Sequence, residues 1–312
     1  HGLPIELAVE RTLGIKKEDI GTKISVEEYN QACRKEVMKY TDRWEELTRI
    51  MGYWVDMKDP YITYDNKYIE SVWWLLKQLF EKNMLYKGYT IQPYSPAAGT
   101  GLSSHELNQP GCYRNVKDTS AVAMFEASGA LPTALNIPAN IRVCFLAWTT
   151  TPWTLPSNTA LAVGAEIQYS AVHTFAPLWG EEVVVILAND LVSKYFPEQN
   201  AQLDWSAYQA GDKNTPFKVL GSAMGKDLQG IHYQQLLPFQ QPADGDAFRI
   251  ITGDFVTTSD GTGIVHIAPS FGADDFRVAK QHGIGTLTLV DRRGRFLPVV
   301  ADGQFLYGEE FV

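Results

Sequence analysis

Residues 141–158 have the sequence IRVCFLAWTTTPWTLPSN, and much of the chain's organisation can be inferred outward from them. Residues 141–147 are mostly apolar, which predicts a short buried β-strand. Three threonines, residues 149–151, come just after it, and Pro152 and Pro156 follow; proline cannot donate to a strand ladder. We therefore expect an irregular, exposed path that presents hydroxyl groups and backbone amides at a surface. The alternative is that β-branched threonines simply end the strand and the Trp-Pro pairs pack the turn.

The string at residues 148–158, WTTTPWTLPSN, resembles the threonine-rich segment of the editing domain of isoleucyl-tRNA synthetases, which are class I aminoacyl-tRNA synthetases. Valyl and leucyl relatives resemble Thr-Thr-Arg-Pro at this point, whereas this chain has Thr-Thr-Thr-Pro-Trp. The resemblance implies catalytic roles for Thr149, Thr150 and Thr151 in hydrolysing a misattached amino acid. It also implies that Trp148 and Asn158 contact the substrate.

Residues 260–276, DGTGIVHIAPSFGADDF, form a second motif. The Val-His-Ile segment predicts a strand, and a helix is expected to begin at Asp274 and to end at Gly283. The motif lacks both the Gly-x-Gly-x-x-Gly spacing and the Lys-Ser/Thr pair of nucleotide-binding loops. An acid at a helix N-terminus is stabilised by the helix dipole, and one aspartate suffices for that purpose. We therefore expect Asp274 to cap the helix and Asp275 to have no capping duty that Asp274 cannot perform.

The second motif is similar to Gly-Thr-Gly-x-Val-His-x-Ala-Pro-x-x-Gly-x-Asp-Asp of the same family. There the second aspartate binds the α-ammonium of the misattached amino acid, and the corresponding residue here is Asp275. From the residues alone, His266 is either a satisfied core histidine or a general base with a pKa near neutrality. The resemblance places it on the pocket wall that meets the amino-acid side chain. No histidine or cysteine lies at metal-ligand spacing from it, so we expect no metal.

The chemistry that these residues predict needs no cofactor. An aminoacyl ester is activated enough to be hydrolysed by a positioned water once its carbonyl is polarised and the substrate is oriented. A threonine nucleophile would need an adjacent base, which the sequence does not show near residues 149–151, so we favour attack by water. The resemblance assigns ATP and Mg²⁺ to a separate synthetic site, whose His-x-Gly-His and Lys-Met-Ser-Lys-Ser motifs are absent from these residues.

The chain begins with HGLPIE and without an initiator methionine, which suggests a fragment of a longer protein. The segment is similar to one in the nucleotide-binding half of these synthetases. Apolar residues at steps of three and four predict one helix over residues 25–51, with a Ser25–Glu28 capping box, and another over residues 68–87. We expect residues 1–90 to be a connecting helical segment from the edge of the catalytic Rossmann domain, and residues 91–312 to be the editing domain.

The editing part is predicted to be rich in β-strands. Residues 94–106 form a loop rich in Gly, Pro and Ser that lacks the cysteines of the zinc knuckle that relatives often carry. Beyond residue 119 the pattern changes to short apolar segments bounded by turn residues. These segments are residues 121–125, 141–147, 167–174, 182–187, 217–222, 248–251, 263–267 and 286–290. The expected fold is mixed α/β, with a closed or strongly curved β-barrel-like domain decorated with helices.

Composition limits the functional classes. The 312 residues are 45% hydrophobic, as in ordinary globular proteins, and no apolar run approaches the roughly 20 residues of a membrane span. With no leader visible, a soluble cytoplasmic protein that does not meet a membrane is expected. Cys33, Cys112 and Cys144 lie far apart, so free thiols are expected.

The net charge of -9 counts against a surface that grips nucleic acid broadly, so an RNA partner must be held locally. Arg292, Arg293 and Arg295 are candidates, although so short a run more commonly forms a solvated turn. The resemblance implies a monomer that binds the 3' end of an isoleucine tRNA carrying valine. The alternatives are a non-catalytic tRNA-docking insertion, and the editing domain of a valyl or leucyl relative.

Overall fold

The computed structural model describes residues 2–95 and 97–301, so His1 and Pro96, which belong to the segments discussed above, lie outside the described residues. The chain divides into two compact units, His1–Gly88 and Tyr89–Val312. The roles assigned to the two parts in a larger enzyme stay predictions.

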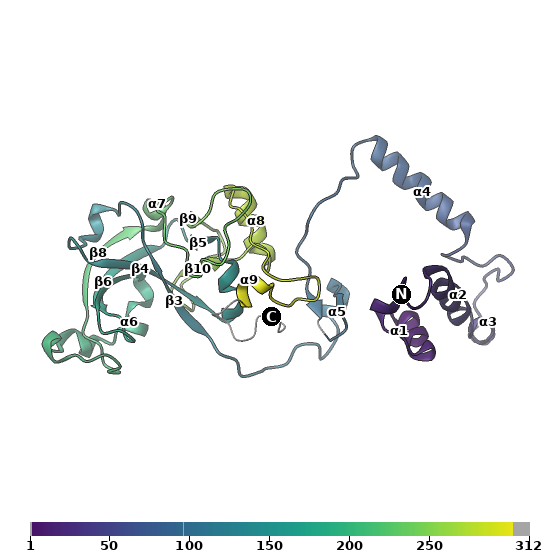
Figure 1. Cartoon of the computed structure of the whole chain (residues 1–312), viewed down its shortest axis with the longest axis horizontal. Helices are drawn as coiled ribbons and strands as arrows, with labels where there is room; N and C mark the ends of the chain where they lie inside the picture. Colours follow the sequence, from purple (N-terminus) through teal and green to yellow (C-terminus); the bar gives the residue numbers. More distant parts are fainter. Residues whose placement is uncertain (1, 96, 302–312) are drawn as a thin grey trace. The chain divides into compact units, whose positions relative to one another are not determined.

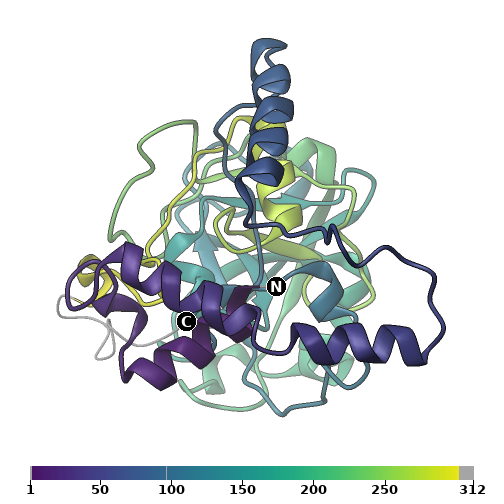
Figure 2. The same cartoon turned by 90° about the vertical axis from the view of Figure 1, so that its right-hand side faces the viewer.

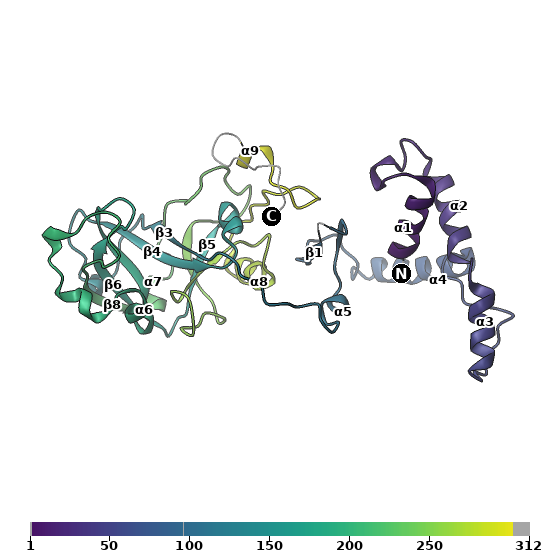
Figure 3. The same cartoon turned by 90° about the horizontal axis from the view of Figure 1, so that it is seen from below.

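The first unit is helical. Its helices are α1 (Gly2–Leu13), α2 (Val26–Val37), α3 (Thr41–Ile50) and α4 (Asn66–Glu81). Helices α1 and α2 lie side by side (Figures 1 and 3), and α4 is one uninterrupted helix (Figure 2). The predicted capping box is confirmed, because Ser25 Oγ accepts from Glu28 N at 3.2 Å and the Glu28 carboxylate accepts from Ser25 N at 3.1 Å.

The single helix predicted over residues 25–51 is wrong, and α1 was not predicted. The helix is interrupted between α2 and α3 although the apolar period continues, and there the Met38 carbonyl accepts from both the N–H and the hydroxyl of Thr41, at 3.2 and 2.9 Å. The backbone bond from the Thr41 N–H to the Met38 carbonyl spans three residues, whereas a bond within an α-helix spans four. The chain therefore turns before α3 begins. Helix α4 ends six residues before the predicted limit of residue 87 and is followed by Asn83, which has φ 56°.

The second unit contains two sheets of functional importance. The strands are β3 (Ala121–Glu126), β4 (Arg142–Thr149), β5 (Ala160–Val163), β6 (Gln168–Phe175), β7 (Glu182–Ala188), β8 (Lys218–Met224), β9 (Arg249–Thr252) and β10 (Ile264–Ile267). The five-stranded sheet has the order β3-β4-β7-β6-β8 and the three-stranded sheet the order β10-β5-β9. All pairs are antiparallel except β4–β7 and β5–β9. A small hairpin, β1 (Tyr94–Ser95) with β2 (Thr100–Gly101), and the short helix α5 (Ser104–Leu107) precede them.

The main core lies between the two sheets. Phe145 and Ile186 of the five-stranded sheet pack in one cluster with Leu161, Ile250 and Ile264 of the three-stranded sheet. The opposite face of the three-stranded sheet is covered by α8 (Ala273–His282). The opposite face of the five-stranded sheet packs against α6 (Val192–Tyr195), and Figures 1 and 3 show both helices in these places. Strands buried on both faces are apolar without strict alternation, as β4 and β7 are.

The predicted mixed α/β class is confirmed. Within the described residues both sheets remain open, so the expected closed barrel is not formed, and the two sheets pack against each other instead. Every predicted strand is present except residues 286–290, where Val290 makes only an isolated bridge to Phe296. There the Leu287 carbonyl accepts from the Ser270 hydroxyl at 2.9 Å instead of from a neighbouring strand. Strand β5 was missed because its four residues are all buried and show no period.

Two further elements connect the strands and helices of this unit. Helix α7 (Gly225–Leu228) follows β8, and α9 (Pro298–Ala301) ends the described chain. The arginines at residues 292–295 lie in a turn, where Asp291 accepts from the backbone N–H groups of Arg293 and Arg295. Within residues 2–95 and 97–301, no helix combines the length and the apolar character that a bilayer crossing requires.

Candidate functional site

The two sequence motifs meet where β4 ends beside β10. Thr262, just before β10, donates its hydroxyl proton to the Leu146 carbonyl of β4 at 2.6 Å. The Thr262 carbonyl accepts from the N–H of Ala188, the last residue of β7, at 2.9 Å. These bonds join the two sheets at one corner. Because β4 continues directly into residues 149–151, the threonine run lies next to the second motif.

A cavity of about 400 Å³ lies between the motifs, at the small end of the about 300–1,000 Å³ usual for ligand sites. Its lining consists of Trp148, Thr149, Thr150, Thr151, Trp153, Thr154, Val265, His266, Ala268, Phe271, Gly272 and Asp275. One part of the wall is aromatic and aliphatic, and the other carries hydroxyl groups and a carboxylate. The site can therefore hold an apolar side chain beside a charged or polar group.

The three threonines are not equivalent. Thr149 is buried and its Oγ1 accepts from Thr151 N at 3.0 Å, and the two hydroxyl oxygens lie 3.3 Å apart. Thr150 is exposed, and within the described ranges its hydroxyl makes no hydrogen bond. Thr150 is thus the threonine whose hydroxyl is free to contact a ligand, while Thr149 and Thr151 shape the loop.

The chain after the threonines is more regular than expected. Pro152 begins a six-residue 3₁₀ helix, Pro152–Ser157, in which Thr154, Pro156 and Ser157 are buried. Proline fits the first position of a helix because its missing N–H would have no partner there. The predicted irregular, exposed path is therefore wrong for this half of the segment, and only Thr150 and Trp153 are exposed.

His266 is a neutral, buried member of the pocket wall. Its side chain is 7% exposed, its Nε2 lies 3.1 Å from Thr154 Oγ1, and burial lowers its pKa from 6.5 to about 4. Burial disfavours the imidazolium form because no charge or solvent stabilises it. This environment disfavours a general base with a pKa near neutrality, and His266 lines the pocket wall.

Asp275 is a half-buried carboxylate without a basic partner among the described residues. Burial raises the pKa of Asp275, and the N–H of Ala268, 2.8 Å from Oδ1, opposes that rise. No lysine, arginine or histidine among residues 2–95 and 97–301 forms an ion pair with it. A carboxylate that lines a pocket and lacks a cation stabilises a cationic ligand group there.

The sequence assigned the helix cap to the wrong residue. Gly272 is the N-cap of α8, and Asp274 and Asp275 are its second and third residues. Asp274 is exposed and pairs with Arg277 at 3.3 Å, so it is a surface group. Asp275 accepts from the Ala268 N–H at 2.8 Å, which is a structural contact that the sequence did not predict. It can approach because Gly272 has no side chain; a Cβ there would lie 2.2 Å from Asp275 Oδ2.

The family model for tRNA synthetases class I (I, L, M and V) matches residues 1–277.

The chain belongs to this class I tRNA synthetase family.

Among its relatives, the isoleucine–tRNA ligase of Bacteroides fragilis is 60% identical over 300 residues, which are 96% of this chain and 26% of that protein. The isoleucine–tRNA ligase of Cytophaga hutchinsonii is 61% identical over 97% of this chain and 28% of its own length. That of Clostridium tetani is 42% identical over 96% of this chain and 26% of its own. The chain thus spans about a quarter of the length of these relatives.

Solved structures of low similarity also match this synthetase chain. The Plasmodium knowlesi cytosolic leucyl-tRNA synthetase editing domain has 14% identity and a TM-score of 0.36, covering 50% of this chain and 60% of that one. The corresponding domain of Plasmodium falciparum has 15% identity and a TM-score of 0.32, covering 44% and 45%.

Asn158 lies outside the pocket of this class I synthetase chain. Its side chain is 2% exposed, donates to the Ala160 carbonyl at 2.8 Å and accepts from the Tyr233 hydroxyl at 2.6 Å. These bonds fix the start of β5, so the substrate contact expected for Asn158 is not seen in this geometry. Trp148 does line the pocket, and its ring lies against Gly261, where a Cβ would come within 2.9 Å of it.

Thr154 and Phe271 line the pocket but were not singled out from the sequence. For Thr154 the signal was available, because it lies inside the quoted string three residues after Thr151. Nothing in the sequence, however, distinguishes it from a turn residue. Its importance comes from His266, 112 residues away.

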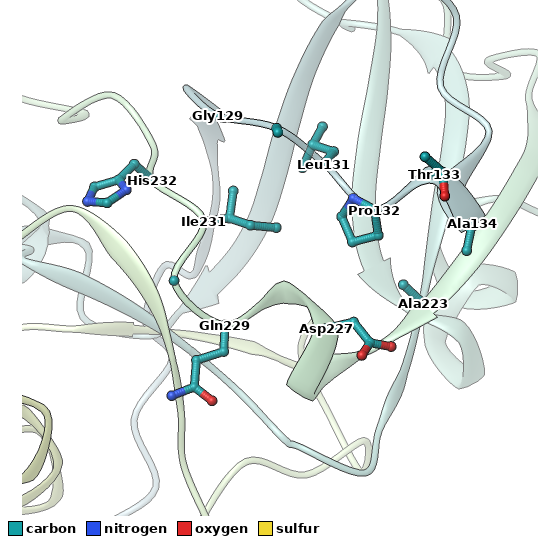
Figure 4. Close-up of a pocket in the computed structure, with 12 residues that line it drawn as sticks. Gly129, Leu131, Pro132, Thr133, Ala134, Ala223, Asp227, Gln229, Ile231 and His232 are labelled. Atoms are coloured by element: carbon teal, nitrogen blue, oxygen red, sulfur yellow. The ribbon is translucent and has the colours of Figure 1, made fainter.

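A larger cavity, about 810 Å³, lies elsewhere in the same unit, between residues 129–134 and 227–232. Figure 4 shows the side chains of Asp227, Gln229 and His232 pointing in different directions instead of converging. This cavity has no set of aligned polar groups, and neither sequence motif contributes to it. The smaller pocket is therefore the better candidate for chemistry.

Proposed function

We propose that this chain hydrolyses the ester bond of valine wrongly attached to an isoleucine tRNA, as the editing part of an isoleucyl-tRNA synthetase. The observation that carries the proposal is Asp275, a half-buried carboxylate that lines the pocket without a basic partner among the described residues. The α-ammonium of an aminoacyl ester is a cation that uncharged tRNA lacks. The similarity to isoleucine–tRNA ligases supports the choice of tRNA and amino acid.

In this proposal the ammonium binds Asp275 and the carbonyl faces the threonine loop. The free hydroxyl of Thr150 polarises the carbonyl, whereas the Thr151 N–H is already used in its bond to Thr149 Oγ1. A water attacks the carbonyl carbon, the bond to the ribose oxygen breaks, and that oxygen takes up a proton, so valine and intact tRNA are released. Aligned donors at a developing oxyanion are a major source of rate enhancement.

The geometry gives no support to a threonine nucleophile. Activating a threonine requires a base within hydrogen-bond reach. The nearest imidazole, His266, is tied to Thr154, and the contacts of the Thr149 and Thr151 side chains are with the threonines of the same segment. Attack by water remains the simplest route, and it needs no metal or cofactor. ATP and Mg²⁺ belong, in this proposal, to the separate synthetic site.

Selectivity follows from pocket size. An apolar pocket discriminates between two ligands that differ by one methylene by only about 1–3 kcal/mol. Isoleucyl-tRNA synthetase is the standard example of this limit, so the expectation of a second site comes from that enzyme class. A second, smaller site removes the valine that passes the first. Here Trp153, Val265 and Phe271 supply apolar wall, and His266 closes one side. The extra methylene of isoleucine would not fit against this wall without overpacking it.

The proposed partner is the 3' end of the isoleucine tRNA, with a monomeric protein acting in the cytoplasm. The net charge of -9 favours recognition of the acceptor end alone over a broad grip on the tRNA body.

Deacylation assays test the proposal. The 312-residue chain should hydrolyse valyl-tRNA(Ile) well above the spontaneous rate and should leave isoleucyl-tRNA(Ile) nearly untouched. Binding of tRNA without hydrolysis would favour the docking insertion. Preference for threonyl-tRNA(Val) or for a noncognate ester of tRNA(Leu) would favour a valyl or leucyl relative. Either result would reject the proposed function.

A further inference from the structure

Thr154 lies at the junction of the two motifs and takes no part in the chemistry proposed above. Its Oγ1 is 2.8 Å from the Thr151 carbonyl, 3.1 Å from His266 Nε2 and 3.4 Å from Thr151 Oγ1. The side chain is 5% exposed. One hydroxyl group therefore connects the threonine loop after β4 with the imidazole on β10.

The protons at this junction can be assigned from the acceptors alone. A carbonyl oxygen only accepts, so the single proton of the Thr154 hydroxyl is used in the bond to Thr151. The oxygen must then accept from His266, which requires that Nε2 carries the imidazole proton. In the neutral ring the other nitrogen is then unprotonated. Nδ1 of His266 is indeed buried and has no hydrogen-bond partner among the described residues.

We propose that Thr154 is the positioning residue of this pocket: its hydroxyl fixes His266 as the Nε2–H tautomer in one ring orientation and ties the 149–151 loop to β10. The catalytic consequence of this role rests on the proposed ester hydrolysis, but the tautomer does not. A pocket that discriminates between valine and isoleucine needs a wall of defined shape. A His266 ring held in one orientation provides it.

Removing the hydroxyl should loosen both partners. Without Thr154 Oγ1, the buried Nε2–H of His266 has no acceptor, so a flipped ring or the Nδ1–H tautomer becomes competitive. The Thr151 carbonyl keeps only its bond from the Thr154 N–H, at 3.0 Å. A displacement of about 1 Å in a positioning loop can slow a reaction by about a hundredfold. We expect the loss to appear in kcat more than in KM, because the ammonium site at Asp275 is unchanged.

The test uses four variants of the 312-residue chain labelled with ¹⁵N in histidine. Thr154→Val removes the hydroxyl and keeps the shape, and Thr154→Ser keeps the hydroxyl. Thr174→Val is the matched control, because Thr174 is equally buried and donates to the Pro216 carbonyl at 2.9 Å in β6, away from the pocket. The ¹⁵N shifts of the His266 ring nitrogens, assigned with His266→Gln, report the tautomer directly.

In the parent protein and in Thr174→Val, His266 should show a protonated Nε2 and an unprotonated Nδ1. Thr154→Val should lose that pattern and should lower kcat for valyl-tRNA(Ile) by about ten- to a hundredfold, and Thr154→Ser should restore most of both. A parent protein with Nδ1 protonated would overturn the proposal whether or not any variant folds. So would a folded Thr154→Val protein with unchanged ring shifts. If the parent protein shows the expected shifts but hydrolyses no valyl ester, the proposed function fails and the positioning of His266 stands.

Discussion

Replacing Asp275 separates its two duties, which are to hold a cation and to accept the Ala268 N–H. Asp275→Asn keeps an oxygen for the 2.8 Å bond to Ala268 and removes the negative charge. Asp275→Ala removes both. If the carboxylate binds the substrate ammonium, both variants should lose hydrolysis, but only the alanine variant should lose stability.

The magnitudes follow from the burial of the group. Breaking a desolvated charge pair costs about 2–5 kcal/mol, and each 1.36 kcal/mol is about a tenfold change in rate. We therefore expect valyl-tRNA(Ile) deacylation to fall by roughly 30-fold to several thousandfold in both variants. In Asp275→Ala the buried Ala268 N–H loses its acceptor, which costs about 1–3 kcal/mol of the free energy of unfolding. In Asp275→Asn the free energy of unfolding should be unchanged or higher, because a half-buried charge without a basic partner is removed.

Single-turnover deacylation and thermal unfolding of the same preparations provide the two readouts. Asp274→Asn is the matched control, because its carboxylate is exposed, pairs only with Arg277 among the described residues and lies outside the pocket. It should keep near-normal hydrolysis and lose at most about 1 kcal/mol of stability. Hydrolysis retained in folded Asp275→Asn would refute the reasoning, since the ammonium would then be held by another group.

Three further results are expected. In single-turnover assays, Thr150→Ala should raise the deacylation barrier by about 1–3 kcal/mol, and the double variant Thr150→Ala with Thr151→Ala should raise it by at least as much. Unchanged rates would show that these threonines have only a structural role. His266→Ala should shrink the wall and allow hydrolysis of isoleucyl-tRNA(Ile), whereas equal loss on both esters would indicate that His266 only positions the substrate. The pKa of His266 lies at about 4 in the folded protein against 6.5 when unfolded, so the unfolded state binds the extra proton and stability falls as pH decreases through that window. Urea unfolding should show the parent losing about 2–3 kcal/mol more than His266→Gln between pH 7 and 4.5, and equal losses would show that His266 is not buried and neutral.

Much of the second unit could be predicted because the sequence signals for its strands and motifs lie within short contiguous segments. Strands such as β4 and β7 are continuous apolar runs bounded by turn residues, and each half of the pocket is one contiguous motif. The end of α8 at Gly283 was also predictable, since that residue has φ 65°, which glycine adopts without strain. The break between α2 and α3 was not, because the apolar period continues across it and a single side-chain bond from Thr41 accompanies the turn.

The features that could not be predicted are contacts between distant residues. The bond between Thr154 and His266 joins residues 112 apart, and the bond from Thr262 to the Leu146 carbonyl joins residues 116 apart. The cap of α8 was misassigned because an aspartate near a helix start is usually a cap. Here the Asp275 side chain instead reaches back past Gly272 to Ala268. Asn158 was misplaced for a similar reason, since its partner Tyr233 lies in a part of the sequence that resembles nothing specific.

The most direct test of the central claim is a crystal structure of this chain with a valyl-adenosine analogue in which a stable amide replaces the ester. The account predicts the analogue in the pocket between β4 and β10, with its ammonium at hydrogen-bond distance from Asp275, its carbonyl facing Thr150 and its isopropyl group against His266. An analogue bound in the cavity between residues 129–134 and 227–232, or in the pocket with its ammonium away from Asp275, would contradict it.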